Sequence, residues 1–225
     1  GGVLMKNIIR FIAAAAVLVM LALPVQAHEK GDWIFRAGVG MVSPDNPVYS
    51  DEDVAVRVDD GTSLTLMGTY MITENWAFDI LAAWPFTHEA SLDFGVAGTI
   101  PLAEFDHLPP TFSFQYHFIP DGKFQPYVGL GLNYTTFFSI DIDSGLAEAL
   151  DAVGSTIDLD LDDSFGVAAQ VGADIMMNDR WLFNVDVRYL SIETDATLSL
   201  DGVAEDPIKL DVNPWVYSLN IGYKF

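Results

Sequence analysis

The stretch Trp215-Val216-Tyr217-Ser218-Leu219-Asn220-Ile221-Gly222-Tyr223-Lys224-Phe225 decides the fold class. Each odd-numbered position in it carries a large apolar side chain, whereas each even-numbered position except Val216 carries a small or polar one. Alternation with a period of two places the two sets of side chains on opposite faces of a β-strand. The stretch therefore predicts a strand with one strongly apolar face.

The same alternation recurs at Trp76–Trp84, Thr111–Phe118 and Trp181–Leu190. In a soluble β-sandwich the second face is freely charged because water covers it. Here that face consists largely of Gly, Ala, Ser, Thr and Asn, and the aromatic residues gather toward the strand ends. A lipid-facing band flanked by aromatic girdles has this composition. We therefore interpret the chain as a transmembrane β-barrel rather than a soluble sandwich.

Eight strands are expected, at 31–43, 61–72, 76–86, 110–119, 124–138, 157–177, 181–199 and 208–225. Short turns at 73–75, 120–123 and 178–180 join them at one rim. Long segments at 44–60, 87–109, 139–156 and 200–207 join them at the other. This asymmetry is typical of outer-membrane barrels, and a spanning barrel must close because unpaired backbone groups in hydrocarbon are costly. The predicted fold class is all-β, an eight-stranded antiparallel transmembrane β-barrel of the bacterial outer membrane, too narrow for a water-filled general porin.

Residues 1–27 have the pattern of a signal peptide. Lys6 and Arg10 precede an apolar run, and Val25-Gln26-Ala27 provides the small-x-small ending of a cleavage site. The run is shorter than the roughly 20 residues that a membrane-spanning helix needs. We expect translation to start at Met5, residues 1–27 to be removed, and residues 28–225 to form the barrel in the outer membrane of a Gram-negative cell.

Composition excludes several classes of protein. Lys and Arg number 10 against 32 Asp and Glu, so the formal net charge is -22, and no basic cluster is present to hold nucleic acid. The 15 Phe, 8 Tyr and 5 Trp argue against an acidic disordered chain. The absence of cysteine excludes disulfides, thiol nucleophiles and cysteine-based zinc sites.

Six stretches of the sequence carry a family resemblance. They are His28-Glu29-Lys30-Gly31, Arg36-Ala37-Gly38, Leu81-Ala82-Ala83-Trp84-Pro85-Phe86, His107-Leu108-Pro109-Pro110-Thr111, the block from Phe124 to Phe138, and Gly222-Tyr223-Lys224-Phe225. With these stretches the chain resembles the outer membrane protein W (OmpW) family. These matches follow in order along the whole of residues 28–225. The resemblance implies an eight-stranded barrel that takes small hydrophobic molecules into the outer membrane, with alkane-uptake relatives in the family.

In each expected strand, the less apolar set of alternating side chains points into the barrel, and we call this set the inward parity. In the lower part of the barrel it includes charges of both signs, so the lower lumen is expected to be polar. The residues concerned are Arg36, Asp79, His117, Asp174, Asp186, Arg188 and Lys224. Charges in so narrow an interior should pair, because an isolated buried ion is costly. We therefore predict an ionic plug in the lower lumen.

Higher in the barrel the same parity gives mainly apolar residues. The residues concerned are Val42, Met67, Leu81, Ala83, Phe137, Leu190, Ile192 and Val216. We expect them to line a cup in which a small hydrophobic solute gains about 25 cal/mol for each Å² that it buries. Such a solute cannot cross the plug, so its predicted exit is sideways into the membrane.

Five prolines fall near the upper ends of the expected strands: Pro44, Pro85, Pro109, Pro110 and Pro214. Proline cannot donate a hydrogen bond to a β-ladder. The prolines either only end the strands or allow the wall to open, and the family resemblance favours the opening. The predicted function is an outer-membrane channel for small hydrophobic solutes. The alternative is a structural or adhesive barrel, favoured if loops, especially an expected short helix at Leu146–Val153, fill the cup.

No enzyme, cofactor or metal site is expected. Ser113 and His117 share a strand face but lie roughly 13 Å apart, too far for a nucleophile and its base. The acidic run Asp158–Asp163 lacks the turn glycine and late glutamate of a helix-loop-helix calcium site. We interpret it as a solvated acidic rim that repels anionic solutes and shares divalent cations with the phosphates of lipopolysaccharide, while calcium binding stays the open alternative.

The expected partners are outer-membrane lipids, lipopolysaccharide, the outer-membrane insertion machinery and small hydrophobic solutes. Tyr223 and Phe225 are assigned to assembly. Both belong to the lipid-facing parity of the closing strand. Phe225 also resembles the terminal aromatic residue that the insertion machinery uses.

Overall fold

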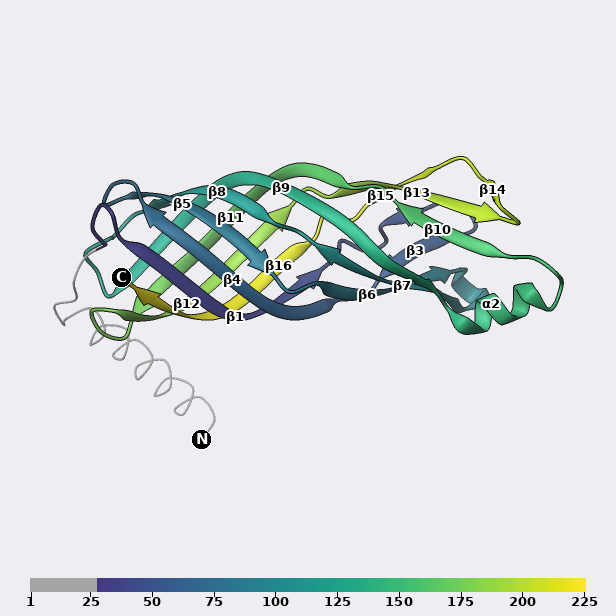
Figure 1. Cartoon of the computed structure of the whole chain (residues 1–225), viewed down its shortest axis with the longest axis horizontal. Helices are drawn as coiled ribbons and strands as arrows, with labels where there is room; N and C mark the ends of the chain where they lie inside the picture. Colours follow the sequence, from purple (N-terminus) through teal and green to yellow (C-terminus); the bar gives the residue numbers. More distant parts are fainter. Residues whose placement is uncertain (1–27) are drawn as a thin grey trace, which may run out of the picture.

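The structure, a computed structural model, describes residues 28–225, and the expected signal peptide at 1–27 lies outside them. Eight antiparallel strands form a closed ring in the order β11-β12-β16-β1-β4-β5-β8-β9, which the β9–β11 pairing closes (Figure 1). Their bounds are β1 (Trp33–Ser43), β4 (Gly61–Met71), β5 (Trp76–Ala83), β8 (Thr111–His117), β9 (Phe124–Ile142), β11 (Ser164–Met176), β12 (Trp181–Leu190) and β16 (Trp215–Lys224). The predicted closed barrel is therefore confirmed. Within residues 28–225 no helix has the length and apolar character to cross a membrane.

The two faces of the strands differ as the alternation predicts. In β16, Trp215 and Tyr217 are exposed on the outside of the barrel, whereas Val216 and Ser218 are buried inside it. The pairing of β1 with β16 runs from Ile34 opposite Lys224 to Ser43 opposite Trp215 without a shift. Large apolar side chains therefore cover the outer wall, as a lipid-facing surface requires.

Opposite the short turns the strands continue beyond the ring as two separate sheets, on the right of Figure 1. One sheet contains β2 (Tyr49–Ser50), β3 (Ala55–Val58), β6 (Phe86–Asp93), β7 (Thr99–Leu108) and the upper part of β9. The other contains β10 (Ile157–Leu161), β13 (Glu193–Leu200), β14 (Val203–Ala204) and β15 (Ile208–Asp211). A short 3-10 helix, η1 (Gly95–Ala97), connects β6 to β7. We call this region the extracellular extension.

The extension corrects the strand limits expected from the sequence. The segments 44–60 and 87–109 contain paired strands instead of irregular loops, and the expected strands 157–177, 181–199 and 208–225 are each interrupted. The interruptions arise because each segment pairs with its neighbours in the ring at one end and with other strands in one of the two sheets of the extension at the other end. The strand has to change direction between these two parts. Alternation alone does not predict with which strands it then pairs.

The expected short helix forms, but it does not fill the barrel. It is α2 (Ser144–Asp151), two residues earlier at each end than predicted, because the Asp143 carboxylate accepts hydrogen bonds from the backbone N–H groups of Gly145 and Leu146 and so starts it there. None of its residues is buried. It lies at the far tip of the extension (Figure 1). The loop-filled barrel that the alternative function requires is thus not formed by this helix.

Candidate functional site

Two arginines and three aspartates meet inside the ring. Arg36 forms a two-pronged ion pair with Asp174, in which its Nε donates to Oδ1 over 2.9 Å and its Nη2 contacts Oδ2. Arg188 donates from Nη2 to Asp79 Oδ2 over 2.8 Å and from Nε to Asp186 Oδ1 over 2.7 Å. All five side chains are at most 1% exposed. We call Arg36, Asp79, Asp174, Asp186 and Arg188 the ionic network.

Neutral side chains complete the hydrogen bonding of the three carboxylates. The Thr69 hydroxyl donates to Asp79 over 2.6 Å, and the Tyr127 hydroxyl donates to Asp186 over 2.7 Å. The amide of Asn184 donates to Asp174 over 2.8 Å. Sequence reasoning missed Thr69, Tyr127 and Asn184, although their inward parity was the available signal. A buried ionic network with satisfied carboxylates closes the lumen at this height, because a solute passing through it must break these contacts.

The other two residues of the predicted plug lie nearer the short-turn rim. The Lys224 ammonium is 3.6 Å from the carboxylate of Asp32. His117 is buried at the end of β8, with Nε2 3.1 Å from the Oε1 of Gln115. His28, for which no role in the lumen was predicted, is also buried, and its Nε2 lies 3.5 Å from Asp174 Oδ2.

The residues predicted to line an open cup are packed against one another instead. Val42, Leu190, Ile192 and Val216 form one buried cluster with Phe86 and Ala168, and Ala83 and Phe137 pack against it. Met67 and Leu81 are also buried, and the Met67 sulfur lies 3.6 Å from Arg188 Nη2. We call the cluster the apolar layer. These side chains therefore leave no open cup at this height, since side chains from facing strands meet across so narrow a barrel. Of the predicted cup residues, Phe137 also lines an apolar cavity that lies higher.

An apolar cavity lies higher, between the two sheets of the extracellular extension. Its volume is about 130 Å³. Among the residues that line it are Val56, Leu92, Leu102, Leu159, Leu198 and Leu210. Sequence reasoning missed this cavity because it treated much of this region as loops. The signal was the alternation Ile157-Asp158-Leu159-Asp160-Leu161, in which the aspartates are exposed and Leu159 and Leu161 face the cavity.

Two histidines lie between the cavity and the apolar layer. The rings of His88 and His107 are 4.8 Å apart, and the His107 ring stacks on Phe86. Burial, together with a smaller effect of the neighbouring His88, lowers the pKa of His107 to about 3. Burial also lowers the pKa of His88, although the backbone oxygen of Asp59, 2.6 Å from His88 Nδ1, opposes that shift. Both imidazoles are therefore neutral near pH 7 and add no charge between the cavity and the apolar layer. We call this pair of histidines the neck.

The wall beside the apolar layer has an interrupted ladder. The β5–β8 pairing ends at Leu81 opposite Thr111, and pairing resumes with Phe86 opposite His107 in the extension. Trp84 N donates to Leu64 O on the side of β4, and Tyr134 N donates to Pro110 O on the side of β9. The backbone polar groups of successive residues point to opposite neighbouring strands, so those of positions 85 and 109 face the interruption. Both residues are prolines and have no N–H.

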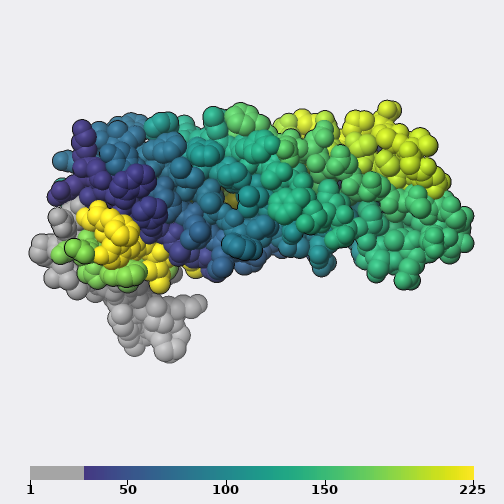
Figure 2. Space-filling view, in the orientation of Figure 1, coloured from purple at the N-terminus to yellow at the C-terminus, as the bar shows by residue number. Residues whose placement is uncertain are grey.

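Figure 2 shows a small opening in this face of the molecule. Blue and teal atoms border it, and the yellow C-terminal part of the chain is visible through it. We call the unpaired stretch between residues 82–85 and 108–110 the lateral seam.

Comparison with known proteins gives consistent matches along the chain. The OmpW family model matches residues 29–225. Outer membrane protein W of Vibrio cholerae serotype O1 is 42% identical over 224 residues, covering 95% of this chain and 98% of that protein. The crystal structure of the outer membrane protein OprG from Pseudomonas aeruginosa is similar with a TM-score of 0.76 and 37% identity, covering 89% of this chain and 99% of that one. The dibenzothiophene metabolism operon protein PahQ of Pseudomonas aeruginosa is 29% identical over 217 residues, covering 92% of this chain and 95% of PahQ.

Proposed function

The chain belongs to the OmpW family of outer-membrane barrels, and on that premise we propose that it takes small hydrophobic molecules from outside the cell into the outer membrane. The observation that carries the proposal is an apolar cavity above an interior that is closed by paired charges. A solute that enters such a cavity has no polar partner to find and no straight path through the barrel.

Entry is driven by burial of apolar surface. A solute seated between Leu102 and Leu159 leaves water and gains about 25 cal/mol for each Å² that it buries. The cavity of about 130 Å³ accepts a small solute or part of a longer one. The exposed aspartates Asp158 and Asp160 on the outer side of β10 add no charge to the cavity lining, but they disfavour the approach of anionic solutes.

The exit that we propose is the lateral seam. Below the cavity a solute meets the neutral histidine pair and the apolar layer, which it can displace at little electrostatic cost. The ionic network beneath would have to lose buried ion pairs before the solute could continue. At the seam, Pro85 and Pro109 have no N–H group, so no ladder hydrogen bond donated by these two residues must first break. The lipid-facing side chains outside it give the solute an apolar destination.

The relative PahQ adds support from its name alone, because dibenzothiophene is an apolar aromatic compound. In this chain, aromatic rings of Phe86, Phe105 and Phe137 surround the two histidines of the neck. Such a surround suits flat aromatic solutes as well as aliphatic ones. We therefore include both kinds in the proposed substrate class.

An uptake assay tests the proposal. Cells that lack the native protein and express each variant are given a radiolabelled apolar solute, and folded barrel in the outer membrane is measured in parallel. Leu159→Asp places a carboxylate in the cavity and should reduce uptake to the level of cells without the barrel. The matched control is Val153→Asp, which adds the same charge at an exposed position after α2 and should leave uptake unchanged.

A structural barrel is the second candidate function. It is favoured by the apolar layer, whose side chains fill the interior instead of leaving a passage. Equal uptake by wild type, Leu159→Asp and cells without the barrel would reject the channel and leave the structural barrel. As a test of the exit alone, Pro109→Ala restores an N–H that faces the seam and should slow uptake without preventing solute binding.

A further inference from the structure

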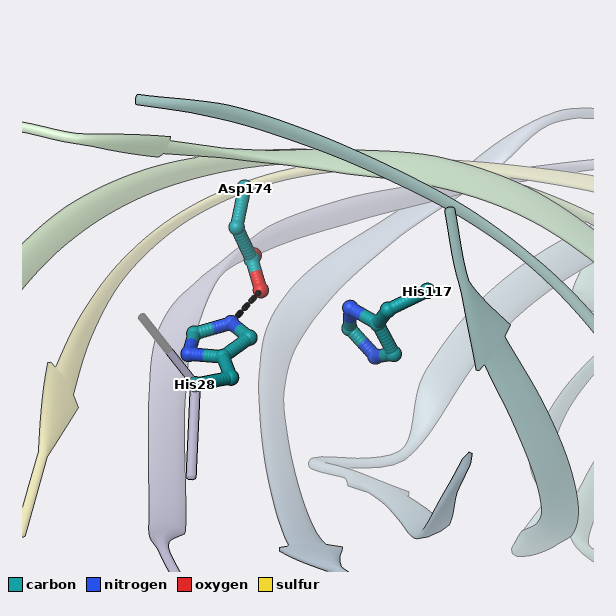
Figure 3. A group of neighbouring side chains, drawn as sticks. All are labelled: His28, His117 and Asp174. Carbon is teal, nitrogen blue, oxygen red and sulfur yellow. Dashed lines mark ion pairs between the residues drawn. The ribbon is translucent and has the colours of Figure 1, made fainter. Parts of the chain in front are cut away.

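We propose that His28, His117 and Asp174 form a binding site for a divalent metal ion of the zinc type at the short-turn end of the barrel interior. Their potential ligand atoms all lie within 4.8 Å of one another, and all three side chains are buried. His28 precedes β1, His117 ends β8, and Asp174 lies on β11. Figure 3 shows the two imidazole rings and the carboxylate converging from these three separate elements.

Unpartnered nitrogens are the first argument for a ligand here. Nδ1 of His28 and Nδ1 of His117 are buried without a hydrogen-bond partner within the described part of the chain, and Nε2 of His28 has only its 3.5 Å ion-pair contact with Asp174. Buried polar atoms are nearly always satisfied, and each exception needs an explanation. A metal bonded to the two imidazoles provides one, because it takes a nitrogen lone pair from each ring.

The surroundings of the ligands are the second argument. His117 Nε2 donates to the amide oxygen of Gln115 over 3.1 Å, which leaves the lone pair of Nδ1 free. Asp174 is held in place by Arg36 and Asn184. In metal sites the ligating histidine donates its other N–H to an oxygen, and the ligating carboxylate is itself hydrogen-bonded. His117 and Asp174 meet these conditions before any metal binds, whereas the second ring nitrogen of His28 has no oxygen partner among the described residues.

Ligand spacing and ligand type favour zinc. Tetrahedral ligands at bond lengths of roughly 2.0–2.1 Å lie about 3.4 Å apart, and His28 Nε2 is 3.5 Å from Asp174 Oδ2. The three ligand atoms lie within 4.8 Å of one another, so the His117 ring has to approach the other two ligands by up to about 1.4 Å to reach this spacing. Imidazole nitrogen suits zinc, copper and nickel, whereas calcium and magnesium prefer oxygen ligands. The nearby Arg36 guanidinium repels a bound cation, so the two imidazoles are expected to supply most of the affinity.

Such a metal would have a structural role. It would tie the segment before β1, which hydrogen-bonds through His28 N to Pro120 O, to β8 and β11. The three ligands otherwise belong to parts of the chain that do not pair with one another in the ladder. Bound metal is therefore expected to stabilise the floor of the barrel against unfolding, independently of any transport.

Calorimetric titration of Zn²⁺ into barrel purified from outer membranes without a histidine tag, and freed of metal with EDTA, tests the site. Wild type should bind one ion with saturation. His28→Gln and His117→Gln should each weaken the zinc affinity at least tenfold. The matched control is His88→Gln, which removes an imidazole from the extracellular extension and should leave the affinity unchanged. Only protein that migrates as a folded band is titrated.

Absence of saturable binding to wild type would overturn the proposal. So would an unchanged zinc affinity in both His28→Gln and His117→Gln, which would assign the zinc to other groups such as the acidic loops. If the His28 and His117 variants fail to fold, wild type alone decides. Zinc must then raise its urea unfolding midpoint relative to EDTA, and an unchanged midpoint rejects the site. None of these outcomes depends on solute uptake, so they are separate from the test of the channel.

Discussion

Replacing Arg188 with alanine is expected to destabilise the barrel strongly, because this guanidinium neutralises two buried carboxylates. Arg188 is 1% exposed and holds Asp79 and Asp186 at 2.8 and 2.7 Å. Removing one partner of a buried ion pair typically costs about 3–5 kcal/mol. The lower end of that range is expected here, because Asp79 keeps the Thr69 hydroxyl and Asp186 keeps the Tyr127 hydroxyl as donors.

Urea unfolding of the barrel in lipid vesicles measures this effect. The matched control is Arg57→Ala, which breaks the ion pair between Arg57 and Asp93. This pair should contribute little to the free energy of unfolding, because the Arg57 side chain is 44% exposed. Adding Asp79→Asn to Arg188→Ala should recover part of the lost stability, since it removes one of the stranded charges. If Arg188→Ala lowered the free energy of unfolding no more than Arg57→Ala does, the ionic network would be solvated and the lumen would not be closed by it.

Three further results are expected. Deleting Phe225, which is 71% exposed on the outer face and packs edge-on against Tyr223, should sharply reduce the folded, heat-modifiable band recovered from outer membranes, and an unchanged yield would count against its role in assembly. Leu81→Asp, which buries a carboxylate at a position that is 3% exposed, should lower the folded yield in outer membranes more than Ile80→Asp on the lipid face, where Asp costs less than the roughly 2–4 kcal/mol of a Lys or Arg at the bilayer midplane; equal folded yields would count against the packed interior at Leu81. His107 has a folded pKa of about 3, below its ordinary 6.5, so the stability it contributes is present above about pH 6.5 and is lost as the pH falls toward 3, by up to about 1.4 kcal/mol per pH unit. Unfolding measured between pH 7 and pH 4 should show a weaker pH dependence in His107→Gln than in wild type.

Much of the barrel could be predicted because alternation is a local property. Whether Trp215 or Val216 faces lipid follows from the two-residue period of a single strand, whatever that strand pairs with. The eight ring strands, the short-turn rim and the inward parity of Arg36 and Asp174 all follow from that period. The approximate position of the exposed helix was also accessible, since its sequence departs from the alternation.

The extracellular extension and its cavity were not accessible in this way. The apolar residues change from odd positions in β12 to even positions in β13, and Asp162 and Asp163 interrupt the pattern between β10 and β11. These local signals indicate a break in each strand, but they do not say which segments pair beyond it. The extension and its cavity depend on which segments pair with one another above the membrane. Asp158 and Asp160 predict only that the outer face of β10 is solvated. The leucines between and after them, Leu159 and Leu161, lie on its inner face and line the cavity.

The sequence by itself determined which side chains enter the barrel, but only the tertiary structure decided which of them meet. Arg36 and Asp174 lie 138 positions apart and on strands that are not neighbours in the ring. Their contact depends on closure of the barrel and on the stagger of its strands, which bring residues of distant strands to one height across the lumen. The same geometry brings His28 and His117 to Asp174, because a narrow closed ring forces inward side chains from opposite walls into contact.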